Sequence, residues 1–277
     1  MPALLCQSSQ SCQPNEPRRN DERRRRAHSR VWSSQWRLCL LLALAALLPF
    51  AAACEPARQA PTPRNAQPLV TNQRTFTYVA IGASDSFGIG TDDPARDNWP
   101  LVLAGLIGPD THLINLGIPG ETAAEARATE LPVALDADPD VVTIWLGVND
   151  ILQSVPVEEY EQNLEAMLHA LDEHTHAHVF VANIPDLSAL PYFAGYNQKQ
   201  IQAKITRWNA AINQAIGATG ALLVDINASW DQVPQHPEYI ASDGLHPSTE
   251  GAKQLATVFL SWITIVMPDI HKKAGAT

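Results

Sequence analysis

The sequence predicts an α/β fold in which a parallel sheet of about five strands is covered on both faces by helices. Short apolar segments alternate with longer segments of helical spacing from residue 76 to residue 267. Strands that alternate with helices are typical of right-handed βαβ units, which place helices on both faces of a parallel sheet. The chain shows no internal repeat, and one domain, residues 76–267, holds the whole alternation.

Five apolar segments predict the strands, and a segment of helical spacing follows each of them. The predicted strands are Thr77–Ile81, His112–Leu116, Val141–Leu146, His178–Asn183 and Ala221–Ile226. The predicted helices are Trp99–Ile107, Ala123–Ala134, Val157–Glu173, Gln198–Ile216 and Thr249–Ile263. In open sheets of this kind, ligands bind outside the carboxyl ends of the strands. We therefore expect functional residues in the loops that follow the strands.

The first 54 residues form a leader with the layout of an export signal. The arginine run Arg23–Arg26 precedes an uncharged apolar segment from Leu38 to Ala53. This segment is shorter than the roughly 20 apolar residues of a membrane-spanning helix, and it ends in small residues, as secretory signals do. Cys54 follows directly, and the arrangement resembles a bacterial lipoprotein signal. We expect an exported protein, either a cell-envelope lipoprotein anchored through Cys54 or a secreted protein cleaved after Ala53; an uncleaved anchor is the third alternative.

The flanking segments and the cysteines set further bounds. Residues 55–75 are rich in Pro, Gln and Asn without apolar periodicity, which predicts an extended tether or an arm packed on the domain. Residues 268–277 are expected to form a C-terminal tail. All four cysteines precede Glu55, so the remaining chain has no disulfide, thiol nucleophile or thiolate metal site.

The charge of the chain excludes one class of partner. The chain has 19 basic and 29 acidic residues, of which eight basic and three acidic residues lie in residues 1–54. The rest of the chain therefore has 11 basic and 26 acidic residues, a net charge of −15. Nucleic-acid binding depends on neutralising phosphates, so we expect no nucleic-acid partner. The acidic balance favours an uncharged or cationic substrate. Membrane contact is expected only through the N-terminal anchor.

Four short blocks place polar side chains around the predicted carboxyl edge of the sheet. They are GASDSFG at 82–88, NLGIPG at 115–120, GVND at 147–150 and DGLHP at 243–247. The first three follow the first three strands, and the fourth precedes the last helix. Each block alone has a structural interpretation, such as a helix cap or a tight turn. Their order and their shared edge favour a functional site instead.

The residues in these blocks are those that acyl-transfer chemistry needs. A serine hydroxyl becomes a nucleophile when a base takes its proton, and histidine titrates near neutral pH. Ser84 and His246 fit these roles, and Asp243 can orient the imidazole. The backbone N–H groups of Ser84 and Gly120 and the side-chain amide of Asn149 are candidate oxyanion-hole donors. We therefore predict a serine esterase that needs no cofactor and no metal.

Over about residues 76–265 the chain resembles the SGNH hydrolases, also called GDSL-type esterases and lipases. In that family Ser, Gly, Asn and His come from four blocks in this order, with Asp three residues before His. The resemblance implies a three-layer α/β/α, flavodoxin-like sandwich. It also implies Ser84 as nucleophile, Gly120 and Asn149 as oxyanion-hole residues, and His246 as base with Asp243 as its partner. The absence of a Gly-x-Ser-x-Gly motif argues against the α/β-hydrolase superfamily.

The serine motif departs from the family pattern, which leaves two candidate serines. The family's usual Gly-Asp-Ser is Gly-Ala-Ser at 82–84, whereas Asp-Ser-Phe at 85–87 imitates Asp-Ser-Leu. The predicted strand ends directly before the glycine at 82, where family members place it, and Gly88 falls at the expected distance after Ser84. Gly90 falls at the same distance after Ser86, so the position of the strand is the stronger of the two arguments for Ser84.

The expected substrates are small-molecule or glycan esters. No long apolar lid and no carbohydrate-binding module is evident, which favours short-acyl or acetyl esters over lipids. The rival hypothesis is a non-catalytic lipoprotein that binds a ligand or glycan in the same cleft, although all of the expected machinery is present.

Two further features have competing interpretations. His174, His176 and His178 alternate before the fourth predicted strand, where a solvated loop is a better interpretation than a metal site. The loop Ala189–Asn197 contains three aromatic residues after the fourth strand. We predict that it forms part of an acyl or alcohol pocket; the alternative is a loop that packs its own aromatics.

Overall fold

A computed structural model describes residues 75–229 and 233–275. These contain a five-stranded parallel sheet with the strand order β2-β1-β3-β4-β5. The strands are β1 (Phe76–Gly82), β2 (Thr111–Asn115), β3 (Val141–Trp145), β4 (His178–Ala182) and β5 (Leu222–Val224). This is the strand order of flavodoxin-like doubly wound folds. The predicted fold class is confirmed, and each strand lies within two residues of its prediction.

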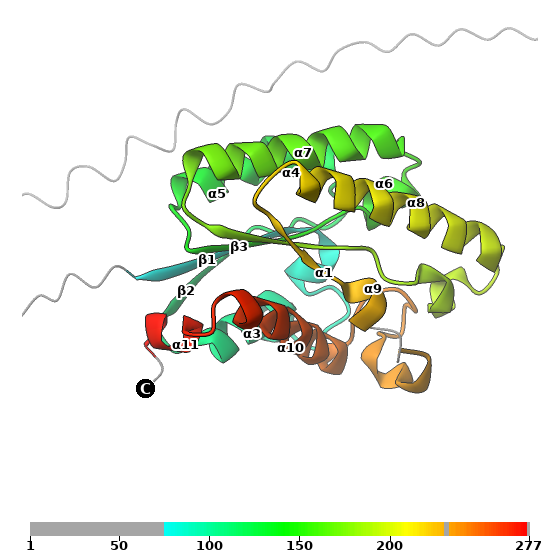
Figure 1. The fold of residues 1–277 in the computed structure, drawn as a ribbon. Coiled ribbons are helices and arrows are strands. Elements are labelled where there is room, and N and C mark those ends of the chain that lie inside the picture. Colours follow the sequence, from blue (N-terminus) through cyan, green and yellow to red (C-terminus); the bar gives the residue numbers. More distant parts are fainter. Residues whose placement is uncertain (1–74, 230–232, 276–277) are drawn as a thin grey trace, which may run out of the picture. The chain divides into compact units, whose positions relative to one another are not determined.

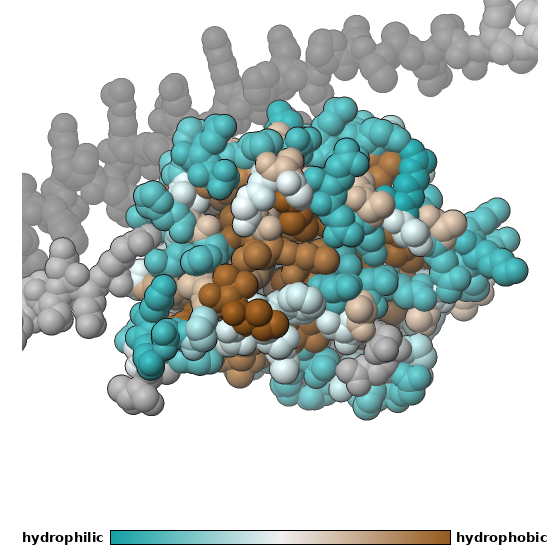
Figure 2. Space-filling view, in the orientation of Figure 1, coloured by the Kyte–Doolittle hydropathy of each residue, from teal (hydrophilic) through white to brown (hydrophobic). Residues whose placement is uncertain are grey.

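Helices cover the sheet on both faces, which gives three layers (Figure 1). One layer holds α3 (Trp99–Ile107) and α10 (Thr249–Val266). The opposite layer holds α4 (Ala123–Thr129), α5 (Leu131–Asp136), α7 (Val157–His174) and α8 (Gln198–Gly217). Figure 2 shows apolar side chains gathered between the two helix layers on the face in view.

The predicted helix Ala123–Ala134 is wrong as a single element. The structure ends α4 at Thr129 and starts α5 at Leu131, with Pro132 in the first turn of the second helix. Proline lacks an N–H and its ring clashes with the carbonyl four residues earlier, so it is tolerated in a first turn but not within a helix. The start of α4 matches its sequence, because Thr122 and Glu125 form a reciprocal capping box.

Several elements are too short for hydrophobic periodicity to predict. Two of them, α1 (Ser84–Phe87) and α6 (Val148–Leu152), begin within three residues after β1 and β3 and carry residues of the candidate site. The others are α2 (Pro94–Asp97), α9 (Ile226–Ser229), α11 (Ile270–Lys273) and the 3-10 segments Leu187–Ala189, Pro191–Phe193, Val233–Gln235 and Pro237–Tyr239.

Aromatic side chains fill the core on both sides of the sheet. Trp99 of α3 stacks on Phe259 of α10 with ring centroids 4.3 Å apart and meets the edge of Trp145 at 6.2 Å. On the other side, Tyr160 of α7 packs against Trp208 of α8 at 4.8 Å. Stacked and edge-to-face pairs of this kind contribute roughly 0.5–1.5 kcal/mol each beyond the area they bury. These aromatic contacts hold the sheet, and with it the carboxyl ends of the strands, between the two helix layers.

The predicted leader 1–54, Cys54 and all but the last residue of the tether 55–75 lie outside the described residues. At the other end of the chain, α11 buries Ile270, and Ala274 accepts a hydrogen bond from the backbone of Asp110 at 3.1 Å. Within residues 75–229 and 233–275, no helix combines the length and the apolar character needed to cross a membrane.

Candidate active site

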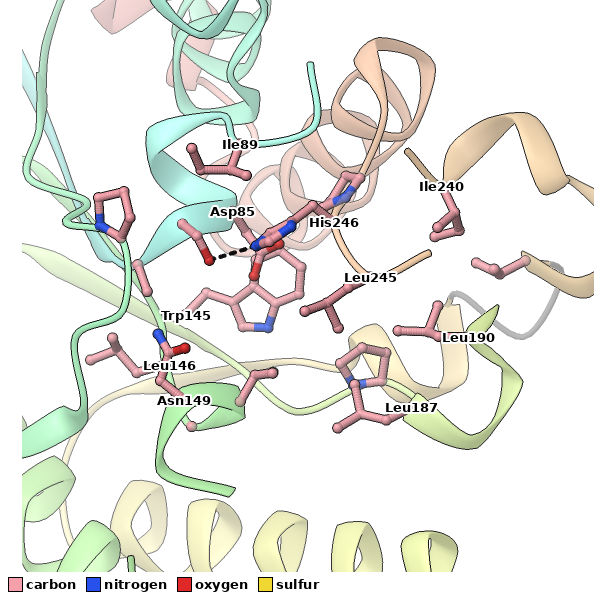
Figure 3. Close-up of a pocket in the computed structure, with 18 of the residues that line it drawn as sticks. Asp85, Ile89, Trp145, Leu146, Asn149, Leu187, Leu190, Ile240, Leu245 and His246 are labelled. Carbon is pink, nitrogen blue, oxygen red and sulfur yellow. Dashed lines mark hydrogen bonds between the residues drawn. The ribbon is translucent and has the colours of Figure 1, made fainter. Parts of the chain in front are cut away.

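Three of the predicted residues form a hydrogen-bonded chain at the carboxyl edge of the sheet. Ser84 is the first residue of α1, directly after β1. Its Oγ lies 2.9 Å from Nε2 of His246, a hydrogen bond drawn as a dashed line in Figure 3. Nδ1 of the same imidazole lies 2.6 Å from Oδ2 of Asp243. Ser84 and His246 are separated by 162 positions along the chain, so the fold alone brings them together.

A tight turn fixes the Asp243 carboxylate behind the imidazole. Its Oδ1 accepts hydrogen bonds from the backbone N–H groups of Leu245 at 2.9 Å and His246 at 3.0 Å. Gly244 has φ +76°, a left-handed conformation that glycine adopts without strain. Partial burial acts to raise the pKa of Asp243, but the hydrogen bonds from His246 and from the two backbone groups outweigh it and hold this pKa below its ordinary value. The carboxylate is therefore ionised at neutral pH.

Contact between two loops sets the spacing of Ser84 and His246. Gly90 follows α1 with φ +95°, and a Cβ added there would lie 2.6 Å from the carbonyl oxygen of Pro247 and 2.8 Å from Cβ of His246. Both distances are shorter than real Cβ contacts, so only glycine lets the two segments approach this closely. The serine segment and the histidine segment are packed backbone against backbone.

Ser86, the competing serine, is buried away from the site. It has no exposed surface, and its Oγ has no hydrogen-bond partner among the described residues. Its side chain faces the backbone of β1 and of the next loop: a Cβ added to Gly82 would lie 2.1 Å from its Oγ, and one added to Gly117 would lie 2.8 Å from its Cβ. The structure therefore places Ser84, and not Ser86, beside the imidazole.

Gly120 and Asn149 line the same pocket as Ser84 and His246. Gly120 has φ +89°, and the space around the position of a missing Cβ is open. The Asn149 side chain donates one amide hydrogen to the carbonyl of Glu121 at 2.9 Å, which leaves its second amide hydrogen for a ligand. All the predicted site residues thus meet at one edge, with Asp243 behind His246 and outside the pocket wall.

Asp150, the last residue of the GVND block, is a structural part of the site. It is 1% exposed and accepts the backbone N–H of Ala123 with both carboxylate oxygens, at 3.2 and 3.1 Å. Burial raises the pKa of Asp150 to about 6. Because it follows Asn149 directly, this contact ties the amide-bearing helix α6 to the start of α4 and fixes the loop that carries Gly120.

Glu130 is a second buried carboxyl group that the sequence did not reveal. It is 1% exposed, and its Oε2 accepts the backbone N–H of Gly82 at 2.9 Å, two residues before Ser84. Burial raises the pKa of Glu130 to about 9, despite the hydrogen bond from Gly82. The side chain is therefore protonated at neutral pH. In the sequence it looks like one of many helical glutamates, and its partner lies 48 positions away.

We expect Glu130→Gln to remove a pH-dependent loss of stability. The unfolded chain releases the Glu130 proton near its ordinary pKa, but the folded chain releases it only near pH 9. The contribution of Glu130 to folding stability must therefore fall as pH rises between about 5 and 9. Glutamine stays neutral and can still accept the Gly82 N–H. Thermal unfolding should show the variant gaining Tm over the native protein toward pH 9.

The control for this prediction is Glu173→Gln at an exposed site of α7. Its Tm should follow that of the native protein at every pH. Parallel curves for Glu130→Gln and the native protein would contradict a neutral, buried Glu130.

The pocket beside Ser84 has a volume of about 510 Å³ and is lined mainly by apolar side chains (Figure 3). Its wall includes Ile89, Trp145, Leu146, Leu187, Leu190, Val233, Ile240 and Leu245. Two carboxylates, Asp85 and Asp186, also line it. Clefts of this size with a few convergent polar groups are typical small-molecule sites.

The loop 189–197 contributes to the pocket through its first residues only. Ala189 and Leu190 line the cavity. The aromatics pack on one another instead, with Phe193 between Tyr192 at 5.0 Å and Tyr196 at 5.6 Å. Tyr192 also donates its backbone N–H to the carbonyl of Gly244 at 3.0 Å. The loop therefore supports the turn that carries the histidine.

The histidine run lies away from this edge. His174 ends α7 and His178 begins β4, at the amino ends of the strands. In the part of the chain that the structure describes, no group of three or more His, Cys, Asp or Glu side chains could hold a metal ion.

Fold and site together define a serine hydrolase built on a doubly wound α/β sandwich. The chain belongs to the GDSL-like Lipase/Acylhydrolase family, whose sequence model matches residues 80–254. It is 26% identical to an acetylxylan esterase from Geobacillus stearothermophilus over 161 residues, which cover 54% of this chain and 70% of that protein. It is 30% identical to an arylesterase from Vibrio mimicus over 189 residues, 67% of this chain and 86% of the relative.

Solved structures share the fold. The crystal structure of TesA has a TM-score of 0.57 and 24% identity, covering 69% of this chain and 99% of TesA. The structure of an acetylxylan esterase from Geobacillus stearothermophilus has a TM-score of 0.57 and 21% identity, and the match covers 68% of this chain and 94% of the esterase. The predicted membership of the SGNH hydrolases and the predicted hydrolysis of carboxylic esters are confirmed at the level of the family.

Proposed function

We propose that this protein hydrolyses carboxylic esters through an acyl-serine intermediate, with Ser84 as nucleophile, His246 as base and Asp243 as the group that orients the base. The observation that carries the proposal is the continuous hydrogen-bonded chain from Asp243 through His246 to Ser84, open to a pocket at its serine end. Nucleophile, base and orienting carboxylate in this geometry are the arrangement of serine hydrolases on several unrelated folds.

In the first half-reaction, His246 Nε2 takes the proton of Ser84 as Oγ attacks the ester carbonyl. The carbonyl oxygen becomes an oxyanion, which accepts hydrogen bonds from the N–H groups of Ser84 and Gly120 and from the free amide hydrogen of Asn149. Each such donor lowers the barrier by about 3–4 kcal/mol. His246 then returns the proton to the leaving alcohol, and the acyl group stays on Ser84.

In the second half-reaction, His246 takes a proton from water, and the resulting hydroxide attacks the acyl-serine. The second oxyanion occupies the same donors. Its collapse releases the carboxylic acid, and the proton on His246 passes back to Ser84 Oγ. Asp243 stays ionised throughout and stabilises the imidazolium that forms in each half.

For the substrate we propose short-acyl or acetyl esters of small alcohols or glycans. The relatives named acetylxylan esterase and arylesterase support this range. The pocket of about 510 Å³ exceeds the volume of an acetyl group, so part of it is available for the alcohol or for a longer acyl chain.

We also propose that the enzyme acts outside the cytoplasm. The support for this is the apolar segment from Leu38 to Ala53 and the cysteine that follows it.

A fluorophosphonate probe and a series of p-nitrophenyl esters test the proposal on the purified protein. We expect covalent labelling at one serine, and hydrolysis that falls from acetate and butyrate to octanoate. A rate that rises toward octanoate would overturn the short-acyl preference alone. Folded protein that neither labels nor hydrolyses any ester would favour the non-catalytic binder.

A further inference from the structure

The pocket contains a carboxylate that the proposed reaction does not use. Asp85 directly follows Ser84 in α1 and lines the same cavity. Figure 3 shows its carboxyl group beside His246, and the two side chains interact electrostatically. No group in residues 75–229 or 233–275 donates a hydrogen bond to it. Burial raises the pKa of Asp85 to about 6, the charge of His246 opposing this, so the side chain is mainly ionised above neutral pH.

The remainder of the described pocket wall holds no positive side chain. It has no Lys or Arg, and its other carboxylate, Asp186, is exposed and bound to Ser188 through the backbone N–H at 2.9 Å and the hydroxyl at 2.5 Å. A negative group on a substrate would therefore meet the Asp85 charge, and the imidazolium that forms on His246 during the reaction is the one positive group in the described pocket wall. In an apolar cavity this repulsion is stronger than in water.

We infer that Asp85 is a specificity-determining residue that excludes esters with a negative charge near the scissile bond and restricts the site to uncharged or cationic esters. The inference rests on the proposed function, since it concerns which esters reach Ser84. Two unit charges about 6 Å apart at an effective dielectric constant of about 20 repel strongly enough to lower kcat/KM about 10- to 100-fold. Uncharged esters do not meet this repulsion.

The test compares three p-nitrophenyl esters of similar length at pH 8. The first is the anionic hemiester of glutaric acid, the second its neutral methyl ester, and the third the cationic 4-trimethylammonio-butanoate. For the native protein we expect the anionic ester to be the poorest substrate and the cationic ester to match or exceed the neutral one. An anionic ester hydrolysed as fast as the neutral ester would overturn the inference without any variant.

The ratio of kcat/KM for the anionic ester to that for the neutral ester isolates the charge of Asp85. We expect Asp85→Asn and Asp85→Leu to raise this ratio about 10- to 100-fold, and Asp85→Glu, which keeps the charge, to leave it low. The matched control is Asp186→Asn, which should change the ratio by less than about twofold because Asp186 is exposed. An unchanged ratio in Asp85→Asn and Asp85→Leu would refute the role of Asp85. Failure of the native protein to hydrolyse the neutral ester would refute the proposed function instead.

Discussion

Ser84→Ala should reduce kcat for ester hydrolysis by about 10⁴- to 10⁶-fold and abolish fluorophosphonate labelling. The variant removes the only hydroxyl within hydrogen-bond distance of His246 Nε2 among the described residues. Alanine at the first position of α1 leaves the backbone and the proposed oxyanion-hole donors in place. The loss should therefore appear in kcat while the far-ultraviolet circular dichroism and Tm stay close to those of the native protein.

Ser86→Ala provides the matched control, two positions along the same short helix. Its buried hydroxyl has no hydrogen-bond partner in the described structure, so its removal should leave kcat within a few fold. Full activity in Ser84→Ala together with loss of activity in Ser86→Ala would reverse the assignment of the nucleophile.

Asp243→Asn should lower kcat by about 10³- to 10⁴-fold without unfolding the turn. The amide oxygen can still accept the N–H groups of Leu245 and His246, which the native Oδ1 accepts at 2.9 and 3.0 Å. The new NH₂ group, however, faces Nδ1 of the imidazole. It forces the tautomer in which Nε2 carries the hydrogen, and that nitrogen can no longer take the proton of Ser84.

Initial rates at saturating ester and a thermal melt together check this prediction. Asp243→Ala is the companion variant, because it loses the hydrogen bonds of the turn as well and should show a lower Tm that Asp243→Asn does not. Activity of Asp243→Asn near the native level would show that His246 is oriented by some other group.

The fold could be predicted from the sequence because the sheet consists of strand–helix units, each of which is continuous along the chain. Each apolar segment and the helix after it could be recognised within a few dozen residues, and the carboxyl-edge rule then placed the four blocks together. Pro132 was visible in the sequence and predicts the break between α4 and α5, but the apolar spacing on either side of it suggested one helix. Helices of about one turn, such as α1 and α6, are too short to show a periodic pattern of apolar residues.

Contacts between distant residues could not be predicted in this way. The hydrogen bond from Gly82 to Glu130 joins a strand to a helix end, and that from Ala123 to Asp150 joins two helix starts. Neither the residue type nor the spacing in the sequence predicts such a pair. Each carboxyl group acquires its structural role only when the fold buries it beside its partner. The same holds for Asp85, whose position next to Ser84 was plain but whose exposure to the pocket follows from the shape of the assembled walls.

Because of the close approach at Gly90, the residues that position Ser84 and His246 differ from the residues that determine which substrate fits the pocket. The distance between nucleophile and base depends on a backbone contact on one side of the cavity, while Leu187 and Val233 form walls that come from other segments. Those walls can be enlarged or narrowed without moving Ser84 relative to His246. Directed evolution of acyl-chain preference should therefore succeed in these segments and fail when any side chain is introduced at position 90.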